Sequence, residues 1–190
     1  MFKKPNNQIK FYQVKCFNSG FTLIETLVAI MMVSIAFLGI YSATAKYAQQ
    51  TKQIKDIYVA SLLGQEGIEI VRNIRDGNWT LGTGNWDDGL TSCSGCSGQT
   101  NGCMAQYDDT SLSAYDSTKY LYIDDGNSFY KYIASPSSSD VKTNYRRQIC
   151  ITPEDLDSDS DNDVLHVTVN VFWTGGRQTT IKEDLYNWKW

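Results

Sequence analysis

The sequence predicts an α+β protein in which one long N-terminal helix packs against a C-terminal antiparallel β-sheet. Three observations support this fold class. Residues 21–41 are almost wholly apolar, residues 42–75 lack proline and repeat apolar side chains at helical spacing, and residues 118–190 alternate as strands do. A chain of 190 residues has room for one domain and an anchor.

The first 20 residues are basic, whereas the rest of the chain is acidic. They hold four lysines and no acid, which leaves 13 basic against 21 acidic residues and a net charge of −8 beyond them. The chain shows no basic patch, so high-affinity nucleic-acid binding is not expected. It has a single histidine and none of the common catalytic motifs, so we do not expect an enzyme.

Residues 21–41 are long enough to span a membrane. As a helix they extend roughly 31 Å, about the hydrocarbon thickness of a bilayer. The lysines before them predict a single pass with the N-terminus in the cytoplasm. Glu25 lies inside this run, where an ionised carboxylate costs about 2.5–3.5 kcal/mol. A residue retained at that cost is expected to have a function.

Residues 19–25, with the sequence SGFTLIE, resemble the class III leader junction of type IV pilins and type II secretion pseudopilins. The shared features are a basic leader, glycine before phenylalanine, glutamate at the fifth mature position and a membrane-length apolar helix. The resemblance implies that a prepilin peptidase cleaves between Gly20 and Phe21 and that the new amino group of Phe21 is methylated. An ordinary signal peptide cleaved near Ala45 and a plain anchor are the alternatives, and neither explains Glu25.

The same resemblance implies a pilin-like fold and a structural role in a type IV pilus or related filament, preferably as a minor pilin of the PilV type. Glu25 of one subunit would pair with the Phe21 amine of a neighbour and serve assembly. The implied partners are other pilin subunits, the prepilin peptidase, the pilus assembly platform and the cytoplasmic membrane. The implied location is the inner membrane before assembly and an extracellular filament afterwards.

Two other functions remain open from the sequence. One is a pseudopilin of a type II secretion or DNA-uptake system. The other, from a different class, is a secreted or membrane-tethered module for cell adhesion or carbohydrate binding.

The expected organisation has three parts: a cleaved leader (1–20), a transmembrane and filament-core helix (21–45) and a globular head (46–190). Within the head we expect an amphipathic helix (46–76), a cysteine-containing loop region (77–117) and a β-sheet (118–190). Gly77 is expected to cap the helix. The apolar stripe of this helix, expected to pack on the core, comprises Ile54, Ile57, Tyr58, Leu62, Ile68, Val71 and Ile74.

Five strand segments follow the loop region. Residues 119–123 and 128–133 flank Asp124-Asp125-Gly126-Asn127, a strong hairpin signal. Residues 144–152 predict another strand. Residues 164–174 alternate most clearly, and Gly175-Gly176 predicts a turn that pairs them with residues 178–186. His166, on the polar face, is expected to be at the surface or hydrogen-bonded.

Four cysteines remain after leader removal, and an even number in an exported domain suggests two disulfides. The four are Cys93, Cys96, Cys103 and Cys150. Strain in a Cys-x-x-Cys bridge favours distant partners for Cys93 and Cys96, but all three connectivities stay open. A zinc site and a redox pair are weaker alternatives.

Residues 155–163 place an aspartate at every second position. A solvated acidic turn between strands is the ordinary interpretation. Oxygen ligands at this spacing also suit Ca²⁺, although the EF-hand pattern is not met. The ligands expected for a calcium ion are Asp157, Asp159, Asp161 and Asp163.

Overall fold

The computed structural model describes residues 20–82, 84–93, 96 and 98–188. The chain divides into two compact units, Met1–Gln49 and Gln50–Trp190. One helix, α1 (Leu23–Leu81), begins in the first unit and ends in the second, and all the strands belong to the second. The predicted α+β class is therefore confirmed.

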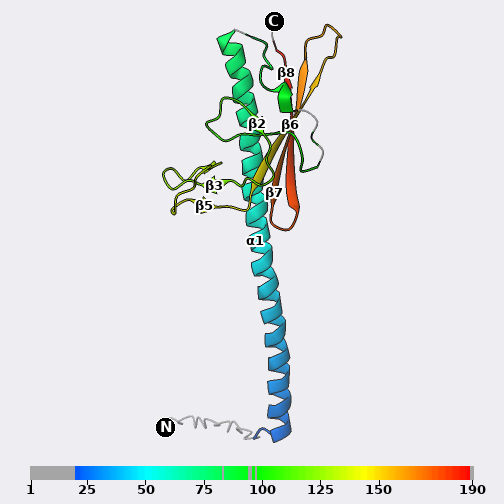
Figure 1. The fold of residues 1–190 in the computed structure, drawn as a ribbon. Coiled ribbons are helices and arrows are strands. Elements are labelled where there is room, and N and C mark those ends of the chain that lie inside the picture. The colour runs from blue at the N-terminus through cyan, green and yellow to red at the C-terminus, as the bar shows by residue number, and fades with distance from the viewer. Residues whose placement is uncertain (1–19, 83, 94–95, 97, 189–190) are drawn as a thin grey trace, which may run out of the picture. The chain divides into compact units, whose positions relative to one another are not determined.

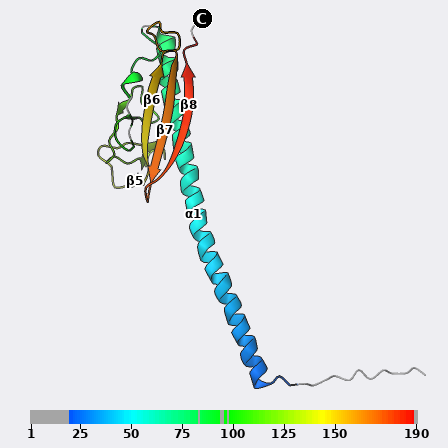
Figure 2. The same cartoon turned by 90° about the vertical axis from the view of Figure 1, so that its right-hand side faces the viewer.

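The main sheet is antiparallel and has five strands in the order β2-β1-β6-β7-β8, in which β1 spans Cys103–Met104 and β2 spans Ser113–Ala114. Its long members, β6 (Arg146–Glu154), β7 (Val164–Trp173) and β8 (Arg177–Tyr186), run side by side along the second half of α1 (Figures 1 and 2). The predicted C-terminal hairpin is confirmed, with Leu165 opposite Leu185 and Trp173 opposite Arg177. Gly175 and Gly176 both have positive φ in its turn.

The core lies between β7 and α1. Alternate residues of β7 are buried, as period-two patterning predicts, and so are residues of α1 at spacings of three and four. The buried β7 residues include Leu165, Val167, Val169 and Val171, and they join Leu63, Val71 and Ile74 in one cluster.

The sheet approaches α1 closely at two glycines, Gly64 and Gly67. A Cβ on Gly67 would lie 2.8 Å from Val169 Cγ1, and one on Gly64 would lie 2.7 Å from Ile181 Cδ1. These glycines cost helix propensity, about 1 kcal/mol each relative to alanine. In return they let the backbone of α1 lie against β7 and β8.

Only part of the expected apolar stripe on α1 is covered by the sheet. Burial begins at Ala60, whereas Ile54, Ile57, Tyr58 and Leu62 remain exposed. A ten-residue strand rises about 33 Å, and residues 60–81 of a helix rise about 32 Å. The strands are therefore too short to cover the helix before residue 60.

The predicted helix end at residue 76 is wrong, because α1 continues through Gly77 to Leu81. The side chain of Thr80 donates to the Asp76 carbonyl at 2.8 Å, and the N–H of Gly82 donates to the Asn78 carbonyl at 3.2 Å. Gly82 has a φ of 61°. The capping glycine is thus Gly82 rather than Gly77.

The region predicted as loop, 77–117, contributes two short strands, of which β2 is at the edge of the main sheet, and a short 3-10 helix. They are η1 (Thr91–Cys93), β1 (Cys103–Met104) and β2 (Ser113–Ala114). β1 joins the main sheet, with Cys103 opposite Ile149 of β6. The 119–133 hairpin is present but shorter, as β3 (Tyr122–Ile123) and β4 (Tyr130–Lys131), and with β5 (Val141–Lys142) it forms a separate small sheet.

Candidate functional site

The N-terminal part of α1 presents an apolar surface that none of the described residues covers. α1 is long and apolar enough to cross a membrane, and none of its most apolar stretch is buried. Phe21 is 80% exposed. Residues 1–19, which make up nearly all of the expected leader, lie outside the described residues.

Thr22 begins the helix next to the expected cleavage point. Its carbonyl accepts from the N–H of Glu25 at 3.1 Å and of Thr26 at 3.2 Å, and its Oγ1 lies 3.4 Å from the Glu25 nitrogen. Thr22 is therefore an N-cap residue. The Thr-x-x-Glu spacing of a capping box is visible in the sequence and could have identified this cap, although our sequence analysis did not use it.

Glu25 lies in the first turn of α1, where the helix dipole favours a negative charge. Among the residues that the structure describes, none forms an ion pair with Glu25. The carboxylate is consequently without a cationic partner from the described part of the chain. Gly20, Phe21 and Glu25 lie close along the chain. Cleavage between Gly20 and Phe21 would therefore place the new amino group of Phe21 near the Glu25 carboxylate in the sequence.

The hydroxyl groups of this segment bond to their own helix. Ser34 Oγ donates to the Ile30 carbonyl at 2.7 Å, and Thr26 Oγ1 donates to the Leu23 carbonyl at 2.8 Å. Side chains that satisfy their donors in this way do not require water. The segment is therefore compatible with lipid, with Glu25 as its exceptional group.

The cysteines form two disulfides in the structure, Cys93–Cys103 and Cys96–Cys150. Of the three connectivities open from the sequence, this is one in which Cys93 and Cys96 take different partners. Cys103 lies in β1 and Cys150 in β6, so the two bridges attach Cys93 and Cys96 to the main sheet.

The acidic loop between β6 and β7 brings together a different set of aspartates from the one expected. Asp155, Asp157 and Asp159 each offer an oxygen, and these oxygens lie within 4.8 Å of one another. Asp161 is not part of this group but lines a cavity on the head. Asp163 instead accepts from the N–H of Leu156 at 2.7 Å and so closes the loop.

The loop is also held by its own carboxylates. Asp155 accepts from the N–H groups of Ser158 and Ser160, both of which have positive φ. The pKa of Asp157 is raised: the N–H of Asp159 lowers it, but partial desolvation and the carboxylates of Asp159 and Asp163 raise it by more.

His166 is hydrogen-bonded at the surface of the sheet. Its Nδ1 lies 2.7 Å from Asp184 Oδ1 and its Nε2 lies 2.7 Å from Glu154 Oε2. Hydrogen bonds to Glu154 and to Asp184 raise the pKa of His166. The imidazole thus links the three long strands through their polar face.

Comparison with protein families supports the assignment of the N-terminal segment. Residues 17–41 match the model of the prokaryotic N-terminal methylation motif. No curated protein and no solved structure matches the chain significantly. The matched motif supports a structural subunit of a filament of the pilin or pseudopilin kind. The chain therefore carries the prokaryotic N-terminal methylation motif, which supports the resemblance to the type IV pilin family, and its α+β fold is consistent with a pilin-like fold.

Proposed function

We propose that this protein is a minor pilin, inserted in the cytoplasmic membrane through its N-terminal helix and then built into a type IV pilus. The prepilin peptidase removes residues 1–20, and the amino group of Phe21 is methylated. The observation that carries the proposal is the carboxylate of Glu25, which lies in the first turn of an exposed apolar helix without an ion pair from the described chain.

Glu25 acts in assembly by binding the Phe21 amine of a neighbouring subunit. Two charges at the edge of lipid are costly alone but neutralise each other when paired. The pair also fixes the axial register between subunits, because only one offset brings amine and carboxylate together. The exposed apolar side chains of residues 21–41 then pack against equivalent helices in the filament core.

Glu25→Val tests this mechanism in cells. The variant is expected to insert in the membrane at wild-type level but to appear in sheared filaments at a small fraction of the wild-type amount. Glu69→Gln, which removes a carboxylate from the head half of the same helix, is the matched control and should assemble normally. Wild-type incorporation of Glu25→Val would refute the pairing.

Mass spectrometry of the mature chain separates the remaining functions. A start at N-methylated Phe21 supports filament assembly, whereas a start near Lys46 would identify a secreted binding module. Quantification against the other pilins of the same filaments then distinguishes a minor pilin from a major one. Recovery only with a secretion or DNA-uptake apparatus would favour the pseudopilin role.

A further inference from the structure

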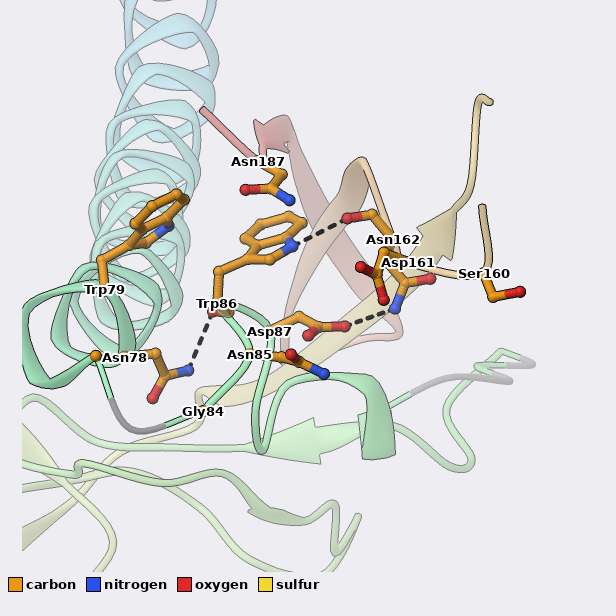
Figure 3. A pocket seen from close by; sticks show the side chains of 11 residues that line it. Asn78, Trp79, Gly84, Asn85, Trp86, Asp87, Ser160, Asp161, Asn162 and Asn187 are labelled. Carbon is orange, nitrogen blue, oxygen red and sulfur yellow. Dashed lines mark hydrogen bonds between the residues drawn. The ribbon is translucent and has the colours of Figure 1, made fainter. Parts of the chain in front are cut away.

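The head contains a polar cavity of about 290 Å³ that none of the functions above uses. Four segments form its wall: the last turns of α1, the turn at 84–87, the acidic loop at 160–162 and Asn187 after β8. Figure 3 shows Trp79, Trp86, Asp87, Asn162 and Asn187 around the same space.

Hydrogen bonds between these segments build the wall of the cavity. Asn78 Nδ2 donates to the carbonyls of Trp86 and Asp88, which ties the turn to α1. Trp86 Nε1 donates to the Asn162 carbonyl at 2.9 Å, and Asn162 Nδ2 donates to the Asp87 carboxylate. The site is thus pre-formed, which lowers the conformational cost of binding a ligand.

Two residues of the lining each have a polar atom that is buried and has no hydrogen-bond partner among the described residues. These atoms are a donor, Trp79 Nε1, and an acceptor, Asn187 Oδ1. Buried polar atoms nearly always have a partner, so an unpaired donor and an unpaired acceptor on two residues of one lining point to a ligand that both accepts and donates. Hydroxyl groups do both.

The electrostatics of the lining select the charge of the ligand. Asp87 is only 9% exposed, Asp161 also lines the cavity, and the described lining includes no lysine or arginine. An anionic ligand would be repelled. A Ca²⁺ ion needs six to eight oxygen ligands at about 2.3–2.6 Å, whereas this cavity is much larger than an ion and is lined partly by the indole rings of Trp79 and Trp86.

The aromatic residues add an apolar surface beside the polar groups. Trp79 is stacked against Trp188, with centroids 4.9 Å apart and planes at 17°. A sugar ring presents hydroxyl groups at its edge and C–H groups on its face, so it matches hydrogen-bonding atoms placed beside indole rings. We propose that this cavity binds a neutral sugar unit of a glycan, held by Trp79, Asp87 and Asn187.

Saturation-transfer NMR on the full chain tests the proposal, in a detergent without a sugar headgroup. The probes are glucose, galactose, N-acetylglucosamine, lactose and cellobiose. We expect transfer to at least one of them. Trp79→Phe, which removes the N–H but keeps an aromatic ring, and Asn187→Ala should each weaken that binding about threefold to tenfold, as loss of one hydrogen bond does.

Trp173→Phe is the matched control. Trp173 Nε1 is also buried without a partner among the described residues, but Trp173 does not line the cavity. This variant should bind sugar as the wild type does. If circular dichroism shows that Trp79→Phe does not fold, the test of the proposal is whether Asn187→Ala weakens sugar binding.

Three results would overturn the proposal. They are no transfer to any of the five sugars, equal weakening by Trp173→Phe and Trp79→Phe, or a response to Ca²⁺ alone with none to sugar. The measurement uses unassembled protein, so its failure leaves the filament role untouched. Failure of assembly by Glu25→Val likewise leaves the glycan site untouched.

Discussion

The guanidinium of Arg147 in β6 donates a hydrogen bond to the main-chain carbonyl of Leu63 in α1, with Nη1 3.0 Å from the oxygen. Its Nη2 donates to the carbonyl of Ala105, and the Glu66 carboxylate lies 3.2 Å from Nη1. Arg147 is fully buried. One side chain thus joins the helix, the main sheet and the segment after β1.

Arg147→Lys should destabilise the head substantially. Lysine carries a single ammonium and cannot reproduce the planar fork that reaches both carbonyls. Each buried acceptor that loses its partner costs about 1–3 kcal/mol. Thermal and urea unfolding of the full chain in detergent measures this loss. Arg177→Lys, at an exposed position of β8, is the control, and an equal effect of the two would contradict the role of Arg147.

Two glycines of α1 should respond to alanine in opposite directions. At Gly67 the added methyl would lie 2.8 Å from Val169 Cγ1 and 3.0 Å from Arg147 Cδ, so overpacking costs about 1–3 kcal/mol. At Gly77 no atom lies within 4 Å of the added methyl, and higher helix propensity gains about 1 kcal/mol. Melting temperatures of the two variants should fall on opposite sides of the wild type.

Features that depend on neighbouring residues in the sequence are predictable here. β7 can be predicted because one of its faces is buried, so apolar and polar residues alternate along its sequence. Gly175-Gly176 marks the turn to β8. The segment from Gly20 to Glu25 is contiguous, so its motif can be recognised without a fold.

Features that depend on distant contacts are not predictable in this way. β1 has two residues, and its position in the sheet depends on two disulfides and on Ile149. A charged residue in a strand normally faces solvent, so nothing in the sequence indicates that Arg147 is buried against Leu63. The wall of the cavity is formed by four separate segments of the chain, so no local sequence pattern predicts it.

The stability contributed by His166 should depend on pH. Its folded-state pKa is raised by Glu154 and Asp184, so the folded chain holds the proton more tightly than the unfolded chain does. This stabilisation is fully present below the unfolded value of about 6.5 and is lost as pH rises through the folded pKa. His166→Gln should therefore lower the melting temperature at pH 5.5 and have little effect at pH 9.

The size of that effect is limited by exposure. The His166 side chain is 42% exposed, so solvent screens its ion pairs and the loss should be below about 1 kcal/mol. High salt should reduce it further at pH 5.5. A loss that is equal at the two pH values would show that packing, rather than charge, is responsible.

Asp157→Asn should raise stability at neutral pH. Because the folded-state pKa of Asp157 is raised, its ionised form opposes folding, and this penalty appears as pH rises through the folded pKa. Asparagine keeps the oxygen that accepts from the N–H of Asp159 at 3.1 Å but removes the charge. The gain in melting temperature should shrink on acidification, and exposed Asp108→Asn should show no such gain.

The effect of Ca²⁺ on the melting temperature distinguishes the two interpretations of the acidic loop between β6 and β7, a solvated turn and an ion site. A solvated acidic turn predicts a melting temperature that is unchanged by Ca²⁺ or chelator at constant ionic strength. An ion site predicts a rise with Ca²⁺, because the ion offsets the mutual repulsion of the carboxylates. If that rise disappears in Asp157→Asn but persists in Asp161→Asn, the ligands are the converging group of Asp155, Asp157 and Asp159. If the rise is also lost in Asp161→Asn and Asp163→Asn, the ligands are instead the set expected from the alternating sequence. In that case Asp163 must give up its hydrogen bond from the Leu156 N–H in order to reach the ion.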